Sequence, residues 1–203
     1  MWNASGLGKR AVADGGERVQ IEKRDEWRAW LQDNHERGYG VWVVTFKKHC
    51  GARHVPYEII IEEALCFGWI DSLPRALDDE RTMRWFAPRK PGSGWSALNK
   101  ARVEKMIAEG RMAAPGLEKV RAAERDGSWN ALDAVDALAM PGDLQKALAG
   151  HDPARRNFDG FPRSVRRGIL EWIASAKTPE TRARRVRETA RSAKNNVRAN
   201  QWR

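Results

Sequence analysis

Residues 62–99 read EEALCFGWIDSLPRALDDERTMRWFAPRKPGSGWSALN and set the pattern of the fold. An apolar helix ends within the first letters, and a strand then begins at 69–72. A polar turn at 77–80 separates that strand from its partner at 82–86, which predicts an antiparallel hairpin. Prolines and glycines interrupt regular backbone in the segment 87–94 that follows, before the next helix begins. This stretch therefore predicts a strand pair with a helix on each side.

Outward from the hairpin, the same patterns predict two more strands and several helices. RVQIE at 18–22 and GVWVVTF at 40–46 have the alternation or the β-branched content of strands. Apolar residues spaced three and four apart predict helices elsewhere. These helices are expected to begin near Asp25, Pro56, Ser96, Pro115, Asp143, Pro153, Ser164 and Thr178. The expected fold class is α+β, with a small, mainly antiparallel sheet and packed helices, followed by a helical C-terminal module.

We expect four regions along the chain. Residues 1–16 are rich in Gly and Ala without periodicity, which predicts a flexible N-terminal arm. The α+β domain is expected over 17–139 and the helical C-terminal module over 140–193. Residues 194–203 are expected to form a disordered basic tail.

Composition limits the class of protein. The chain has 203 residues, of which 41 % are hydrophobic and ten are Trp, and this is enough for a packed core. It contains no run of about 18 apolar residues, and its first residues lack the apolar centre of a secretory signal. We expect a cytoplasmic protein that does not enter a membrane. Cys50 and Cys66 are expected to stay reduced, because two cysteines cannot build a disulfide framework.

The net charge of +10 is concentrated at the C-terminal end. Residues 163–203 hold twelve Lys and Arg against three Glu, whereas the first 162 residues are almost neutral. Such a positive segment attracts phosphate backbones or acidic surfaces without sequence preference. No recognition motif accompanies the charge, so nucleic acid is not the favoured partner. The predicted nucleic-acid contacts are Arg182, Arg184, Arg185, Arg187 and Arg191.

Four blocks of the sequence resemble the YdeI/OmpD-associated family, whose members are often described as bacteriocin-protection proteins. The blocks are EEALCFGWIDS, LDDER, FAPRKPGSGWSALNKARVEKMIAEGRM and RSVRRGILEWIASAKTPETRARRV. The likeness extends over 17–193, with departures from the family pattern at Pro56 and at Thr82 and Met83. It implies an α+β N-terminal part and a small helical module of the OmpD-associated type in a cytosolic protein. It transfers no catalytic residue.

The favoured ligand-binding region is the Trp- and Arg-rich part of 62–99. Asp71 is expected to pair with Arg84 or Arg89 across the hairpin, either as a structural salt bridge or as an acceptor for a ligand. Guanidinium groups give bidentate donors and indole rings give stacking faces, a combination that suits an anion. The alternative is that the indoles face the core and the Arg side chains face water. The predicted ligand-binding residues are Trp69, Asp71, Arg84, Trp85, Arg89 and Trp95.

The other residues with potentially reactive side chains are expected to have structural roles. Ser93 lacks the G-x-S-x-G elbow of a nucleophile and is expected in a turn. Cys66 lies on an apolar helix, where a buried, inert thiol is usual. His49, Cys50 and His54 lack the paired spacing of a closed zinc site, and no phosphate- or dinucleotide-binding glycine motif is present. We therefore predict no metal, no cofactor and no catalytic residue.

Three functions remain open. We favour a non-catalytic binding protein, linked by the resemblance to stress or bacteriocin tolerance, which contacts an anionic ligand or a protein partner through the Arg/Trp/Asp surface. The second is a small-molecule enzyme that uses the same pocket. The third is a weak, nonspecific nucleic-acid binder that acts through the basic C-terminal tail.

Overall fold

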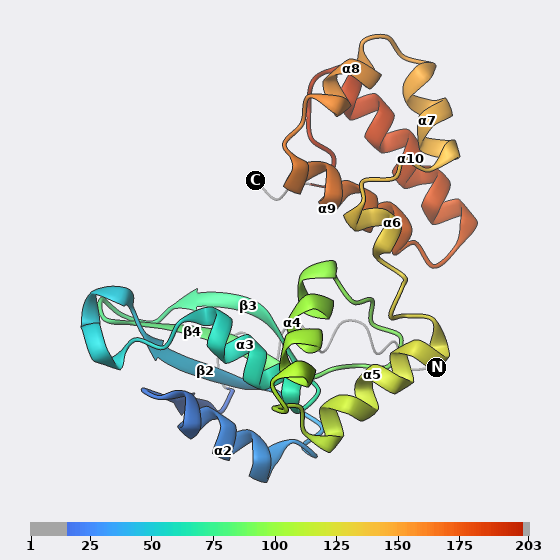
Figure 1. The fold of residues 1–203 in the computed structure, drawn as a ribbon. Coiled ribbons are helices and arrows are strands. Elements are labelled where there is room, and N and C mark those ends of the chain that lie inside the picture. The colour runs from blue at the N-terminus through green and yellow to red at the C-terminus, as the bar shows by residue number, and fades with distance from the viewer. Residues whose placement is uncertain (1–15, 201–203) are drawn as a thin grey trace, which may run out of the picture. The chain divides into compact units, whose positions relative to one another are not determined.

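The computed structural model describes residues 16–200 and divides into two compact units, Met1–Trp129 and Asn130–Arg203. The N-terminal unit contains the sheet, and the C-terminal unit is helical (Figure 1). The change between the units comes after Trp129, ahead of the boundary predicted between residues 139 and 140. The predicted arm lies outside the described residues except for Gly16. No helix in the described part of the chain is both long and apolar enough to span a lipid bilayer.

The sheet has the strand order β1-β2-β4-β3. Its strands are β1 (Arg18–Gln20), β2 (Val41–Phe46), β3 (Trp69–Ala76) and β4 (Arg81–Pro88). β1 and β2 pair in parallel, and the other two pairings are antiparallel. The predicted α+β class with a mainly antiparallel sheet is therefore confirmed. Asp78 closes the turn of the predicted hairpin, because its side chain accepts from the backbone N–H groups of Glu80 and Arg81.

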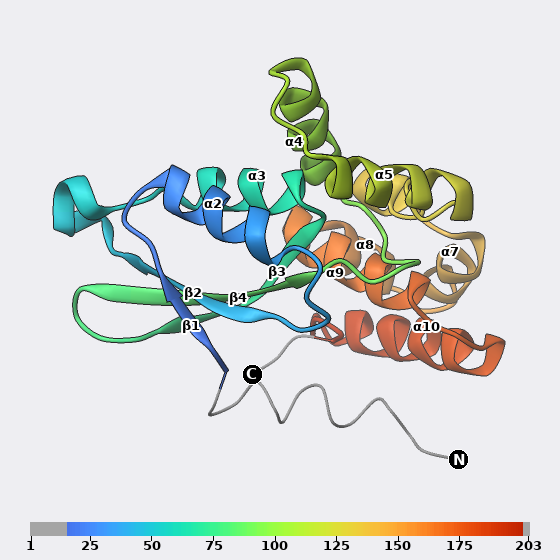
Figure 2. The same ribbon diagram turned by 90° about the horizontal axis from the view of Figure 1, so that it is seen from below.

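Two helices cover one face of this sheet, α2 (Arg24–Asn34) and α3 (Tyr57–Cys66), and they lie side by side there (Figure 2). A 3-10 segment, η1 (Lys48–Arg53), kinked at Gly51, connects β2 to α3. The helices α4 (Ala97–Ala108) and α5 (Ala114–Asp126) complete the unit. Sheet and helices share one core, whose large, fully buried side chains include Trp27, Trp69, Phe86 and Trp95.

The opposite face of the sheet carries a separate apolar cluster. Trp42, Val44 and Met83 are buried there, and Trp85 packs edge-on against Trp42 with ring centroids 5.4 Å apart. Side chains alternate between the two faces along a strand. Val43 therefore joins the helix-covered core, while its neighbours Trp42 and Val44 do not.

The C-terminal unit consists of shorter helices arranged around a long one (Figure 1). The helices are α6 (Asp133–Asp136), α7 (Gly142–Ala149), α8 (Ala154–Asp159), α9 (Arg163–Ala174) and the long α10 (Pro179–Lys194). α7, α8 and α9 contact α10, and α6 contacts α9. The core between them is apolar and includes Leu144, Leu148, Phe158, Ile169 and Ile173.

The described residues after α10 fold back onto this unit, where the sequence predicted disorder over 194–203. Asn196 adopts a left-handed backbone with φ of 54°, a conformation that Asn reaches more readily than most residues. The N–H of Val197 donates to the carbonyl of Ser192 at 2.9 Å. Ala199 then packs into the core with 4 % of its surface exposed.

Candidate functional site

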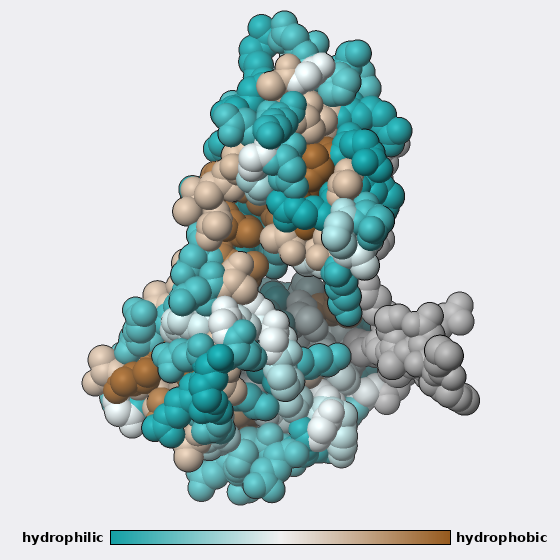
Figure 3. Space-filling view, turned by 90° about the vertical axis from the view of Figure 1, so that its right-hand side faces the viewer, coloured by the Kyte–Doolittle hydropathy of each residue, from teal (hydrophilic) through white to brown (hydrophobic). Residues whose placement is uncertain are grey.

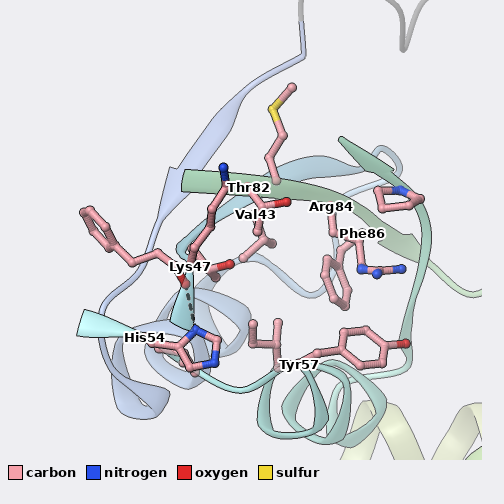
Figure 4. A pocket seen from close by; sticks show the side chains of 13 residues that line it. Val43, Lys47, His54, Tyr57, Thr82, Arg84 and Phe86 are labelled. Carbon is pink, nitrogen blue, oxygen red and sulfur yellow. Dashed lines mark hydrogen bonds between the residues drawn. The ribbon is translucent and has the colours of Figure 1, made fainter. Parts of the chain in front are cut away.

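A small cavity lies in the N-terminal unit between the sheet and the η1–α3 segment (Figure 4). Its volume is about 130 Å³, room for about four water molecules at roughly 30 Å³ each. Apolar side chains make up part of its wall, among them Val43, Val55, Ile60 and Phe86. Polar groups come from Lys47, His54, Tyr57 and Arg84, with two threonines. An apolar wall with a few polar groups is typical of small-molecule sites.

Two neighbours hold Arg84 at one end of the cavity. β4 places Arg84 in register with Val43, on the face that α3 covers. Arg84 Nη1 donates to Asp71 Oδ2 at 2.9 Å, which confirms the ion pair predicted across the hairpin. The Tyr57 hydroxyl donates to the same oxygen at 3.0 Å, and the guanidinium carbon lies 4.5 Å from the centre of the Tyr57 ring. A carboxylate and an aromatic face therefore fix the guanidinium together.

Local backbone features bring these three side chains together. Pro56 precedes the first turn of α3, where its missing N–H costs little, so the helix begins directly at Tyr57. The register of β3 against β4 shifts between Asp71 and Pro74. Such an irregularity re-aims the side chains beside it, and here Asp71 meets both Tyr57 and Arg84.

The electrostatic surroundings keep the Tyr57 hydroxyl a hydrogen-bond donor. Burial has the largest effect, and the charge of Asp71 and its hydrogen bond act in the same direction, so the pKa of Tyr57 is raised above its usual value. The cations Arg84 and Arg102 oppose this rise in pKa without reversing it. Tyr57 therefore remains protonated at neutral pH.

Lys47 and His54 mark the other end of the cavity (Figure 4). Lys47 Nζ donates to the carbonyl of Asp78 at 2.7 Å. His54 Nδ1 lies 2.7 Å from the carbonyl oxygen of Phe46. A carbonyl oxygen can only accept, so Nδ1 carries a hydrogen and Nε2 is the acceptor of the neutral ring. The cavity thus has a basic side chain at each end and an apolar wall between them.

The six residues predicted to bind a ligand are not brought into one site. Asp71 and Arg84 pair at the cavity, as described above. Trp85 follows Arg84 in the strand, so its side chain points to the opposite face of the sheet and packs against Trp42. Trp69 is fully buried, and its indole N–H donates to the carbonyl of His35 at 3.2 Å.

Arg89 and Trp95 form a separate pair in the loop between β4 and α4. Arg89 is 6 % exposed, and its guanidinium carbon lies 3.7 Å from the centre of the Trp95 ring. Its Nη2 donates to the carbonyls of Ser93, at 3.2 Å, and Gly94. Burial lowers the pKa of Arg89 to about 10, so the side chain is still charged at neutral pH. These contacts close the loop on itself, and a ligand contact by this pair stays a prediction.

Sequence reasoning missed Lys47, His54 and Tyr57 as members of a site. Tyr57 lies at the start of the helix expected near Pro56, where no site was predicted, and His54 was weighed only as a metal ligand. Within residues 16–200, no three His, Cys, Asp or Glu side chains are grouped so as to hold a metal ion. The positions of these residues along the chain could have indicated the site. Lys47 directly follows a strand, and His54 and Tyr57 lie within two residues of Pro56, where the next helix begins.

The basic residues predicted to contact nucleic acid lie on α10 and divide into two groups. Arg182 forms an ion pair with Asp143, and Arg185 donates to the backbone carbonyl of Trp172. The other three line a groove between α7 and α10; they are Arg184, Arg187 and Arg191.

Two family models match the chain in separate segments. Residues 19–119 match a domain of unknown function, DUF8412, and residues 137–196 match the model described as Bacteriocin-protection, YdeI or OmpD-Associated. The predicted family resemblance is therefore confirmed over 137–196. Comparisons with curated proteins and with solved structures gave no match.

Proposed function

We propose that the chain, whose residues 137–196 match the YdeI/OmpD-associated family model, is a binding protein that takes a small organic anion in its N-terminal unit. The observation that carries the proposal is the fixed guanidinium of Arg84 at the cavity. With partners among the described residues, the side chain of Arg84 forms one hydrogen bond, through Nη1 to Asp71. Its remaining N–H groups are therefore available to a ligand carboxylate.

Size and wall chemistry narrow the class of ligand. A cavity of about 130 Å³ is well below the roughly 300–1,000 Å³ of sites for drug-sized molecules, so it suits a compound of few atoms. Asp71 offsets the charge of Arg84, so the charge of Lys47 and the remaining N–H donors of Arg84 favour an anion. The apolar side chains between them, Val43, Ile60 and Phe86, suit a short carbon chain. A short-chain carboxylic or dicarboxylic acid meets all three conditions.

Binding fits this cavity better than catalysis does. Of the described residues that line it, none is Asp, Glu, Ser or Cys. Asp71 already accepts from Tyr57 and Arg84, and Nδ1 of His54 is engaged with the carbonyl of Phe46. The hydroxyl–carboxylate pair at the cavity is Tyr57 with Asp71, and Arg84 already engages that carboxylate, which favours binding over covalent catalysis.

The family description adds a physiological setting to this proposal. It reads Bacteriocin-protection, and we propose that anion binding serves tolerance of bacteriocins or a related stress. A host strain that lacks the gene is expected to regain tolerance with the wild-type chain and to fail with Arg84→Gln. Equal rescue by the wild-type chain and by Arg84→Gln would show that tolerance does not depend on the cavity.

Calorimetric titration with two- to six-carbon monocarboxylates and dicarboxylates tests the binding directly. We expect at least one acid to bind, and Arg84→Gln to weaken its binding by about tenfold or more, because a charge-assisted hydrogen bond is lost. Arg81→Gln is the matched control, since it removes the same charge from the same strand outside the cavity. The proposal fails if no acid binds at millimolar concentration, or if both variants weaken binding equally.

A further inference from the structure

The C-terminal unit has a second hollow, much larger than the cavity at Arg84. It is a groove of about 780 Å³ between α7 and α10, which lie side by side (Figures 1 and 2). Small residues lie along it, namely Ala147, Gly150 and Ala190. They leave the groove open between the longer side chains on either side. On the face drawn in Figure 3, hydrophilic side chains cover much of this unit.

The side chains that line the groove carry mainly positive charge. Five cationic side chains line it: Lys146, Arg184, Arg187, Arg191 and Lys194. The one acidic residue among its described lining is Glu188, 3.5 Å from Arg184. An excess of positive charge therefore remains after that pair is counted.

The cations of the groove are also largely unpaired. Elsewhere on the unit, several arginines have carboxylate partners, as Arg182 has Asp143, Arg155 has Asp159 and Arg167 has Asp136. In the described part of the chain, Lys146, Arg187, Arg191 and Lys194 make no side-chain hydrogen bond or ion pair. Like charges three and four residues apart on a helix repel one another. The row on α10 therefore costs stability in the free protein, and this cost is offset when an anion binds.

The spacing of that row matches a chain of phosphates. Arg184, Arg187, Arg191 and Lys194 follow one another at steps of three and four, so they lie on one face of α10. Ten residues of helix span about 15 Å. One strand of a duplex presents about four phosphates over that length, at roughly 3.4 Å each along the axis.

We propose that the α7–α10 groove binds the phosphate backbone of a nucleic acid duplex without reading its sequence. No aromatic side chain other than His151 lies in the described lining, so the groove has no platform for stacking the unpaired bases of a single strand. Arginine and lysine contacts to phosphate position a protein on nucleic acid but carry no sequence information. An acidic protein fits less well, because protein interfaces depend on buried aromatic or large apolar anchors, whereas the apolar lining here is Ala and Gly.

The test measures binding of the full chain to a fluorescent duplex DNA of mixed sequence over a range of salt concentrations. We expect log K to fall with log salt with a slope of about −4, since four phosphates are contacted. Arg187→Gln with Arg191→Gln should weaken binding at least tenfold and reduce that slope by about two. The matched control is Arg156→Gln with Lys177→Gln, which removes two exposed charges outside the groove and should change binding much less.

Competing polyanions distinguish binding of a phosphate backbone from binding of any other anion. Poly-L-glutamate at equal charge should displace the duplex poorly, and inorganic polyphosphate should compete because it shares the phosphate chemistry. Equal losses in the two double variants would mean that net charge alone attracts DNA, and would overturn the proposal. Failure to bind duplex at low salt, or tighter binding of poly-L-glutamate, would overturn it as well. Carboxylate binding at Arg84 is expected to persist in both double variants, so the two proposals can fail separately.

Discussion

Glu63 shows at the scale of one residue how this protein accommodates a buried charge. Its side chain is fully buried on α3, and Arg24, Arg28 and Arg111 all bind its carboxylate. Burial alone would raise the pKa of Glu63, but the hydrogen bonds and charges of these guanidinium groups outweigh it and hold the pKa below its usual value. The network ties α3 to α2 and to the segment between α4 and α5. Glu63 therefore has a structural role, although it lies close to Cys66, whose side chain is of a type that is often reactive.

Glu63→Gln is expected to lower the free energy of unfolding at pH 7 by about 3 kcal/mol, because three buried cationic contacts lose their counter-charge. Since the folded pKa is depressed, the carboxylate stabilises the fold above its ordinary pKa of about 4.3, and this stabilisation is lost as the pH falls through the folded pKa. Denaturation by urea at several pH values should show the gap between wild type and variant narrowing below about pH 4. The exposed Glu58→Gln on the same helix serves as control. A gap that is constant down to pH 2 would contradict this reading.

Cys66 shows that a local apolar pattern can predict both the burial of a thiol and its low reactivity. It was expected to be a buried, inert thiol, and it is fully buried. Burial, with the nearby charge of Glu63, raises the pKa of Cys66 to about 11, so the thiol is protonated at neutral pH. The apolar pattern of its helix was enough for that prediction. The three arginines that bind Glu63 come from distant parts of the chain, so no local pattern in the sequence predicts their ion pairs.

At the scale of elements, the predictions that succeeded rest on local backbone chemistry. Thr178 caps α10, with its hydroxyl accepting from Thr181 N–H, and Ser96 caps α4 in the same way. Ser164 was predicted as a cap, but α9 begins at Arg163 after Pro162. Proline before a first helical turn removes an N–H that would lack a partner, so it competes with a hydroxyl cap.

The six predicted ligand-binding residues are not grouped in one place, and the geometry of strands explains why for two of them. Arg84 and Trp85 are neighbours in β4, so they must face opposite sides of the sheet. The favoured prediction counted the aromatic and cationic residues of 62–99 together, whereas its alternative already placed the indoles and the Arg side chains on different sides. Tyr57 could not be found from that stretch at all, because it meets Asp71 only through the packing of α3 on the hairpin. The alternation of side chains along a strand would have placed Arg84 and Trp85 on opposite faces of the sheet. The cavity could not be predicted in this way, because it depends on packing between distant segments.

The loop between β4 and α4 gives a prediction at the same scale. Arg89 is buried there, stacks on Trp95 and donates to two carbonyls of its own loop. Arg89→Ala should therefore lower the free energy of unfolding by about 2 kcal/mol, since a desolvated cation–π contact and charged hydrogen bonds are lost together. The adjacent, exposed Lys90→Ala should leave it within about 0.5 kcal/mol of wild type. Equal melting temperatures for the two variants would show that Arg89 does not hold the loop.

At the scale of the whole molecule, the main cores of the two units share no residue among those that the structure describes. One is built by the sheet with α2 to α5, and the other by the helices of the C-terminal unit. The two family matches fall on either side of the same division. The net charge is divided as well, because the basic excess lies beyond residue 162. A small-anion site and a phosphate-binding groove can therefore reside on one chain without sharing a residue.

Two cores predict two cooperative units, and hydrogen exchange in the full chain can separate them. Ile169 is fully buried in the C-terminal unit, and Ile169→Ala should cost about 2–5 kcal/mol through lost apolar contacts and the cavity left behind. We expect backbone amides at 130–200 to exchange faster by the corresponding factor, while those at 16–129 keep their wild-type rates. Ile61→Ala in the other core is the reciprocal variant and should speed exchange only at 16–129. If either substitution accelerates exchange equally in both segments, the chain unfolds as one cooperative unit, and the two cores do not fold independently.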